Sequence, residues 1–199
     1  MLEQLKGIPH FEKATVRQLA GQYGLTPKTV DTYISRFLKR REIVLLKRGV
    51  YVTTDFLNQH HDDVSYTFYL ANILRNPSYV SSWTALQYYN LATEAVNTIT
   101  SVTTKVTRTY STKAGSFKYQ SINKDLFADF ALKRGGFDFF IASPSKALFD
   151  MLYFKTHQFR GVEKKEIDRI VEAARVDWDD MDPREKKKFY SMINTYFNG

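Results

Sequence analysis

The sequence predicts an α+β protein that has a basic, helical N-terminal domain and a mixed α/β C-terminal domain with a small sheet and flanking helices. Three observations support this fold class. Helix-capping residues and helical apolar spacing recur in the first forty residues, a pair of short β-rich runs follows, and Thr- and Val-rich runs then alternate with helical segments. The apolar fraction of 43% is sufficient for packed cores.

The N-terminal segment begins with two short helices. Residues 2–8 favour a first helix, and a second is predicted from Val16 to Tyr23 with Thr15 as its N-cap. Gly24 follows it at the position where a left-handed residue commonly ends a helix.

A third helix and a hairpin complete this segment. Thr26 is a good N-cap and Pro27 suits the first helical position, so we expect a helix that ends at about Arg40. Residues 43–46 and 50–52 predict two strands joined by a tight basic turn. The apolar residues of the third helix repeat at i, i+4, i+7 and i+8, which predicts one buried stripe: Val30, Ile34, Phe37 and Leu38.

This order of elements is that of a winged helix-turn-helix, which we expect over residues 1–54. In such a domain the second helix of the motif enters the major groove of duplex DNA, while the hairpin lies along the backbone. The short hydroxyls of this helix suit base edges, and its late cations suit phosphates. The residues expected to bind DNA are polar or basic and lie opposite the stripe or in the turn: Lys28, Thr29, Thr32, Arg36, Lys39, Arg40, Lys47 and Arg48.

The charge distribution favours the same interpretation. Residues 1–52 contain ten Lys and Arg against four Asp and Glu, a net charge of +6, whereas the whole chain carries +8. A concentrated positive field is typical of a surface that binds a polyanion. Two alternatives remain open: the charges only solvate an exposed helix, or the domain binds a protein.

The C-terminal domain is expected over residues 62–199, after a linker at 53–61. Ser143 and Pro144 predict the start of a helix, and Asp182 the start of the last one. The expected elements are helices over 62–74, 82–89, 144–156, 162–175 and 183–197, and strands over 98–110, 117–122 and 137–142.

A second basic surface is predicted beside the strand at 98–110. The period of two of this strand places Lys105 and Arg108 on opposite faces of the sheet. Lys113 and Lys118 flank the next turn, so the edge suits DNA or RNA, or is simply a solvated hairpin.

One charged pair lies farther along the chain. Lys146 and Asp150 are spaced i, i+4 on one predicted helix. If exposed, such a pair contributes about 0.3–0.5 kcal/mol to stability.

The composition and the missing motifs argue against several classes of protein. The chain has no Cys, no run of eighteen apolar residues and no signal-peptide core, so we expect a cytoplasmic protein without disulfides or a membrane span. It has no phosphate-binding loop, nucleophile elbow or zinc-protease motif, so we expect no catalytic residue, cofactor or metal. Two alternatives stay open: a metal site at residues 60–63, and a metal-dependent nuclease that uses Asp138, Asp150, Glu163 and Lys165.

Three separate stretches resemble the AbiEi family of antitoxins. They are residues 77–86 (PSYVSSWTAL), residues 99–112 (ITSVTTKVTRTYST) and residues 141–150 (IASPSKALFD). The last is similar to the family's Pro-x-Lys-Ala-Leu-x-Asp helix. The resemblance includes the N-terminal winged helix and covers most of the chain, but it is weakest after about Thr156.

The resemblance implies a transcriptional autorepressor that is also the antitoxin of a type IV toxin–antitoxin system, which acts in abortive infection. It implies that paired protomers bind inverted repeats in the promoter of the operon. It also implies that the C-terminal domain counteracts a nucleotidyltransferase toxin without a stable complex. An alternative is an interaction protein whose C-terminal domain binds toxin or nucleic acid directly.

Overall fold

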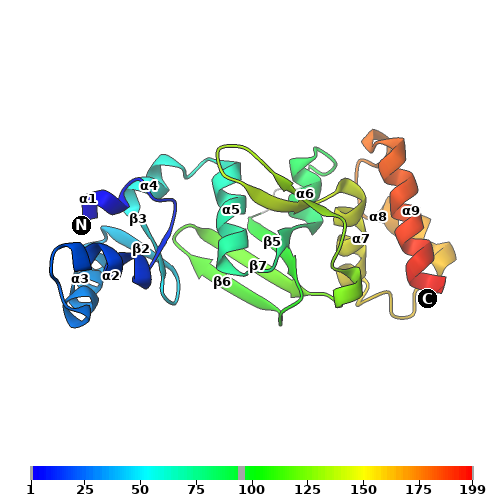
Figure 1. Cartoon of the computed structure of the whole chain (residues 1–199). Helices are drawn as coiled ribbons and strands as arrows, with labels where there is room; N and C mark the ends of the chain where they lie inside the picture. Colours follow the sequence, from blue (N-terminus) through cyan, green and yellow to red (C-terminus); the bar gives the residue numbers. More distant parts are fainter. Residues whose placement is uncertain (1, 94–96, 199) are drawn as a thin grey trace. The chain divides into compact units, whose positions relative to one another are not determined.

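The sequence folds into a mixed α+β arrangement with two sheets (Figure 1). A computed structural model describes residues 2–93 and 97–198. The chain divides into two units, one made of residues up to 67 together with 110–115, and the other of the remaining residues. The first unit therefore extends beyond the segment 1–54 that the sequence suggests.

The first unit combines short helices with a small antiparallel sheet. The strand order of this sheet is β1-β3-β2, in which β3 pairs with both neighbours. Its helices are α1 (Leu2–Leu5), α2 (Lys13–Gln22), α3 (Pro27–Lys39) and α4 (Thr54–Gln59), and its strands are β1 (Phe11–Glu12), β2 (Ile43–Lys47) and β3 (Val50–Thr53).

The start of α3 follows the sequence prediction. The Thr26 side chain accepts a hydrogen bond from the Thr29 backbone N–H at 3.3 Å, and Pro27 occupies the first helical position. This arrangement satisfies one of the free N–H groups at the helix start and tolerates the missing N–H of proline. The helix therefore begins at one defined residue.

The end of α3 is a left-handed cap made without glycine. Arg41 has a φ of 60°. Its N–H bonds to the Leu38 carbonyl, while the Glu42 N–H bonds to the Phe37 carbonyl at 2.9 Å. This is the hydrogen-bond pattern of a Schellman motif, which satisfies the last carbonyls and turns the chain into β2.

The apolar stripe of α3 packs into one cluster with α2 and the sheet. Val30, Ile34 and Phe37 are buried, and Leu38 is partly buried at the edge. The other buried members come from α1, β1, α2, β2 and β3: Leu5, Phe11, Val16, Ala20, Ile43 and Tyr51. Burying one face of α3 leaves its opposite face exposed.

Two local expectations for this unit are wrong. Helix α2 begins at Lys13, without a side-chain cap, rather than after Thr15. The expected linker at 53–61 contains α4, which begins with a hydrogen bond of 3.3 Å from the Phe56 N–H to the Thr53 hydroxyl. Phe56 and its neighbour Leu57 are buried. The linker expectation was wrong because it followed the polar composition of this stretch, although the stretch also contains an N-cap residue and two adjacent apolar residues.

A six-stranded mixed sheet of order β6-β7-β5-β4-β9-β8 lies mostly in the second unit, although residues 110–112 of β6 and residue 115 of β7 belong to the first. Strand β5 is parallel to β7, β4 is parallel to β9, and β4 with β5 and β8 with β9 are antiparallel. The strands are β4 (Tyr79–Val80), β5 (Thr98–Thr103), β6 (Arg108–Thr112), β7 (Gly115–Ser121), β8 (Phe130–Lys133) and β9 (Phe139–Ala142).

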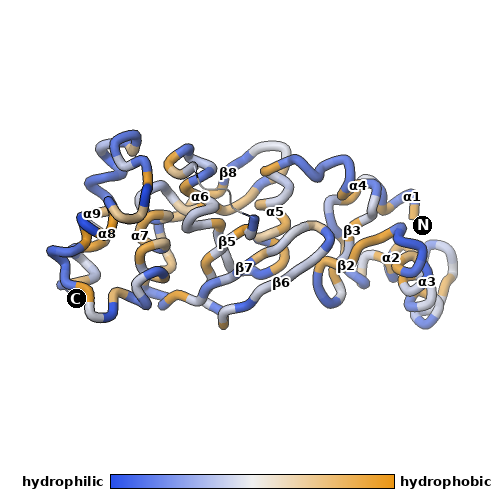
Figure 2. Tube along the Cα trace, turned by 180° about the vertical axis from the view of Figure 1, so that it is seen from behind, coloured by the Kyte–Doolittle hydropathy of each residue, from blue (hydrophilic) through white to orange (hydrophobic). Residues whose placement is uncertain are grey.

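Helix α7 (Pro144–Lys155) is buried along most of its length. Nine of the twelve residues of α7 are buried, so this helix has no wide exposed face. Figure 2 shows hydrophobic residues along α5 and in the strands, and hydrophilic residues at many of the outer turns. The helices are α5 (Val64–Leu74), α6 (Ser82–Tyr88), α7 (Pro144–Lys155), α8 (Ile167–Ala173) and α9 (Pro183–Asn198), with short 3₁₀ turns at 124–126, 164–166 and 178–180.

The predicted strand at 98–110 is interrupted. Thr103 ends β5 because its hydroxyl donates to the Pro77 carbonyl at 2.6 Å and accepts from the Lys105 N–H at 3.2 Å. This local hydrogen bond bends the chain out of the sheet. Lys105 lies in the bend and Arg108 begins β6. The expected placement of the two cations on opposite faces of one strand is therefore wrong.

Candidate nucleic-acid interface

The exposed side of α3 carries a row of polar and basic side chains. Successive positions of a helix rotate by about 100°, so five positions of α3 project away from the buried stripe: 28, 32, 35, 36 and 39. We call this the α3 face, and its members are all exposed: Lys28, Thr32, Ser35, Arg36 and Lys39. Ser35 was not among the predicted residues, although helix rotation alone would have included it.

The charge of the α3 face is not neutralised locally. The one acidic residue of α3 is Asp31, and its carboxylate lies 2.5 Å from the Lys13 ammonium of α2. Within the described part of the chain, Lys28, Arg36 and Lys39 form no ion pair. The face therefore presents three cations to solvent. Exposed cations of this kind can neutralise the phosphates of a nucleic-acid backbone.

The two threonines of α3 differ in their availability. Thr29 is partly buried, and its hydroxyl lies 2.8 Å from the Thr26 hydroxyl within the N-cap. Thr32 is exposed and donates weakly to the Lys28 carbonyl at 3.3 Å, so its oxygen remains free to accept. Thr32 is thus better placed than Thr29 to meet a partner.

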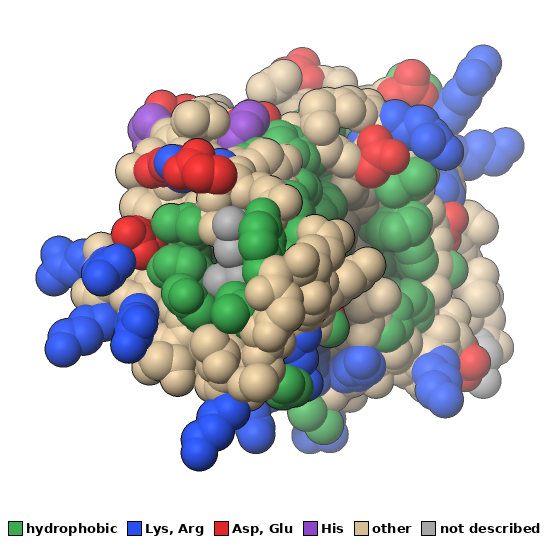
Figure 3. Space-filling model, turned by 60° about the vertical axis from the view of Figure 1, so that its left-hand side comes forward, with side chains coloured by type: hydrophobic (Ala, Val, Ile, Leu, Met, Phe, Trp, Pro, Cys, Tyr) green, Lys and Arg blue, Asp and Glu red, His purple; other side chains and the backbone are tan. Residues whose placement is uncertain are grey.

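Further cations are exposed on the same unit as the α3 face. Arg40 and Arg41 are exposed at the C-terminal end of α3, and Arg17 is exposed on α2. In Figure 3 the side of the molecule that carries the N-terminal residues faces the reader. Lys and Arg side chains extend outward along the left and lower edges of this view. Arg17 and Arg41 lie outside the helix and turn predicted to bind DNA, although the excess of basic residues over 1–52 includes both.

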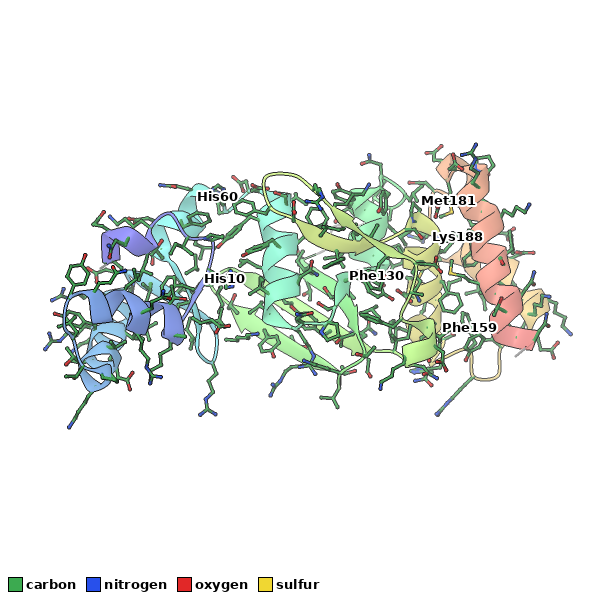
Figure 4. All side chains as sticks on the ribbon, in the orientation of Figure 1. His10, His60, Phe130, Phe159, Met181 and Lys188 are labelled. Carbon is green, nitrogen blue, oxygen red and sulfur yellow. The ribbon has the colours of Figure 1, made fainter. Side chains whose placement is uncertain are left out.

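The turn between β2 and β3 adds a smaller contribution. Gly49 has a φ of +81°, a conformation that suits glycine, and lets the chain reverse within two residues. Arg48 is exposed at this turn, whereas Lys47 is partly buried near His10. Burial lowers the pKa of the His10 imidazole, which is marked in Figure 4, so this ring adds no charge at neutral pH.

The four residues of the second predicted basic surface are all exposed, but they lie on different local elements. The Lys105 ammonium is held 2.5 Å from the Asn76 carbonyl, and Lys113 lies in the turn between β6 and β7. Arg108 is exposed on β6. Lys118 is exposed on β7, on the side opposite to buried residues of the same strand, and it lines open hollows that the other three residues do not line.

The pair Lys146 and Asp150 forms, but in an environment that the sequence did not indicate. Their charged atoms lie 2.6 Å apart, and their side chains are 2% and 0% exposed. The second carboxylate oxygen accepts from the Ser81 hydroxyl at 2.7 Å and the Tyr79 hydroxyl at 3.0 Å. Burial raises the pKa of the Asp150 carboxyl, although its hydrogen-bond donors act in the opposite direction.

The two histidines of the alternative metal site at residues 60–63 contact different carboxylates. His60 lies 3.7 Å from Asp63, and His61 lies 2.9 Å from Asp62, as two separate pairs. Among residues 2–93 and 97–198, no group of three or more His, Asp or Glu is arranged to hold a metal ion.

Over the same residues, no helix combines the length and the apolar character needed to cross a bilayer.

Comparison of the chain with protein-family models, with curated proteins and with solved structures gives no match.

Proposed function

We propose that this chain is a DNA-binding transcriptional repressor whose N-terminal unit is a winged helix-turn-helix. The observation that carries this proposal is the α3 face, where Lys28, Arg36 and Lys39 are exposed and unpaired on the helix that follows a helix and a turn. In this reading α3 enters the major groove, and Arg48 at the β2–β3 turn lies along the backbone. Thr32 and Arg36 meet base edges, and the late cations meet phosphates.

The operator and the location follow from this mode of binding. Two copies of the chain occupy an inverted repeat in the promoter of their own operon, with half-sites one helical turn, or a multiple of one turn, apart. Because the partner is genomic DNA, the protein acts in the cytoplasm. In this proposal the chain binds DNA and does not catalyse a reaction.

The antitoxin part of the proposal rests on the AbiEi-like stretches of the sequence. The second unit would counteract a nucleotidyltransferase toxin encoded beside it, as expected for a type IV system. Co-expression with the neighbouring gene product tests this role. Rescue of growth without co-purification of the two proteins supports it, and growth arrest that the chain does not relieve contradicts it.

Single substitutions on the α3 face test the DNA-binding role. Arg36→Ala and Lys28→Ala are each expected to weaken binding to the promoter by about 1–3 kcal/mol if the side chain contacts a base. A gel-shift titration measures the loss. Lys187→Ala, an exposed lysine of α9, is the control and should bind like the unmodified chain. Equal affinities for all four proteins would contradict the assignment of this face.

A further inference from the structure

Two open hollows adjoin each other on the second unit. Their volumes are about 480 and 630 Å³, and Lys118, Gln120 and Phe154 line both, so they form one continuous depression. Its walls come from β7, the C-terminal end of α7, the first turn of α6 and the residues after α8. We call it the β7–α7 groove.

The charges that line the β7–α7 groove have one sign. Lys118 of β7, Lys155 at the end of α7 and Arg175 after α8 are exposed. None of these three forms an ion pair with a described residue. No acidic side chain occurs among the described residues that line the two hollows. The described lining of the groove therefore contains cations from three separate elements and no carboxylate.

The groove also presents aromatic side chains. Trp83 is partly exposed, and within the described residues no other ring packs against it. Phe154 is partly exposed at the junction of the two hollows, where its ring packs edge-on against Tyr153 at 5.3 Å. Accessible aromatic rings stack on unpaired bases, and unpaired cations contact the phosphates of the same strand. The groove presents both features.

We propose that the β7–α7 groove binds a single strand of nucleic acid. Phosphates contact Lys118, Lys155 and Arg175, while bases stack on Trp83 and Phe154. A single strand is favoured over a duplex because stacking on a side chain requires a base face that pairing and stacking in a duplex conceal. The amide of Gln120 adds a donor and an acceptor for base edges. This site is separate from the α3 face and does not depend on it.

Fluorescence anisotropy of the full chain with labelled single strands of about twelve nucleotides tests the site. RNA and DNA strands of the same sequence form two arms that identify the sugar preferred. The variant K118Q/K155Q/R175Q is expected to bind at least about tenfold more weakly. Its plot of log affinity against log salt should be shallower by about two, since each phosphate contact on a single strand contributes about 0.7 to this slope.

A matched control separates the groove from net charge. The variant K133Q/R184Q/K187Q removes the same three charges from exposed positions that do not line the groove, and it should bind single strands like the unmodified chain. Quenching of tryptophan emission on binding should disappear in Trp83→Phe. Binding of duplex promoter DNA should be unchanged in the groove variant, so that failure here is distinguished from failure of the repressor proposal.

Three results would overturn the proposal. One is the absence of measurable binding to either strand. Another is an equal loss of binding in the groove variant and the control variant. The third is strand binding with full quenching in Trp83→Phe, which would place the bases elsewhere.

Discussion

Replacing Asp150 with Ala is expected to lower the free energy of unfolding by about 3–5 kcal/mol, because it leaves the Lys146 ammonium buried without its counter-ion. The loss also removes the acceptor of the Tyr79 and Ser81 hydroxyls. A buried polar group without a partner costs more than the hydrogen bond itself contributes. Urea unfolding followed by circular dichroism measures the change.

An exposed ion pair of equal length provides the control. The ammonium of Lys165 lies 2.6 Å from the Glu163 carboxylate, the same separation as in the buried pair, but both side chains are mostly exposed. Lys165→Ala should therefore cost less than about 1 kcal/mol. The double variant K146M/D150L should recover part of the stability lost in Asp150→Ala, since it removes both charges together but still leaves the Tyr79 and Ser81 hydroxyls without their acceptor. Equal costs for Asp150→Ala and Lys165→Ala would show that burial does not set the energetics of this pair.

The variant K28Q/R36Q/K39Q is expected to lose at least about a hundredfold in affinity for duplex DNA at low salt. If Lys28 and Lys39 each neutralise one phosphate while Arg36 contacts a base, the salt dependence should also become shallower by about 1.8, because each phosphate contact on a duplex contributes about 0.9 to the slope. Anisotropy titrations over a range of salt concentrations measure both quantities. All three side chains are exposed and unpaired, so the fold should be unaffected.

The control K133Q/R184Q/K187Q tests whether total charge alone explains that loss. It lowers the net charge by the same amount but changes only the second unit. Its affinity and salt slope should stay close to those of the unmodified chain. A similar loss in both triple variants would mean that α3 has no special part in DNA binding.

The features that were predictable from the sequence are those set by neighbouring residues. Thr26 and Pro27 define where α3 begins, and the spacing of Val30, Ile34 and Phe37 defines which side it buries. The exposed cations of the α3 face follow from these two facts. Local hydrogen bonding and helical rotation are sufficient for that much of the candidate site.

The features that were missed depend on residues distant in the sequence. Thr103 ends its strand through a hydrogen bond to Pro77, and the Asp150 carboxylate accepts from hydroxyls of β4 and of the residue that follows it. The spacing of a pair on one helix does not indicate whether a neighbouring element covers it. The cations of the β7–α7 groove are separated by tens of residues, so only the fold brings them together.

Some tertiary contacts also lay outside the reach of sequence patterns. Phe130 on β8 stacks on Tyr79 of β4 with ring centroids 4.5 Å apart, and Lys188 of α9 pairs with Asp129 at 2.9 Å (Figure 4). Strand β8 itself was not predicted because its residues show no alternation of buried and exposed positions. These contacts join β8 and α9 to the rest of the second unit.

Hydroxyl-radical footprinting of the DNA upstream of the gene tests the central claim most directly. We expect two protected blocks with centres about 10 base pairs, or a multiple of this distance, apart. Both blocks should disappear with K28Q/R36Q/K39Q and persist with K133Q/R184Q/K187Q. Protection no stronger than on unrelated DNA, or protection that survives loss of the α3 cations, would contradict the account.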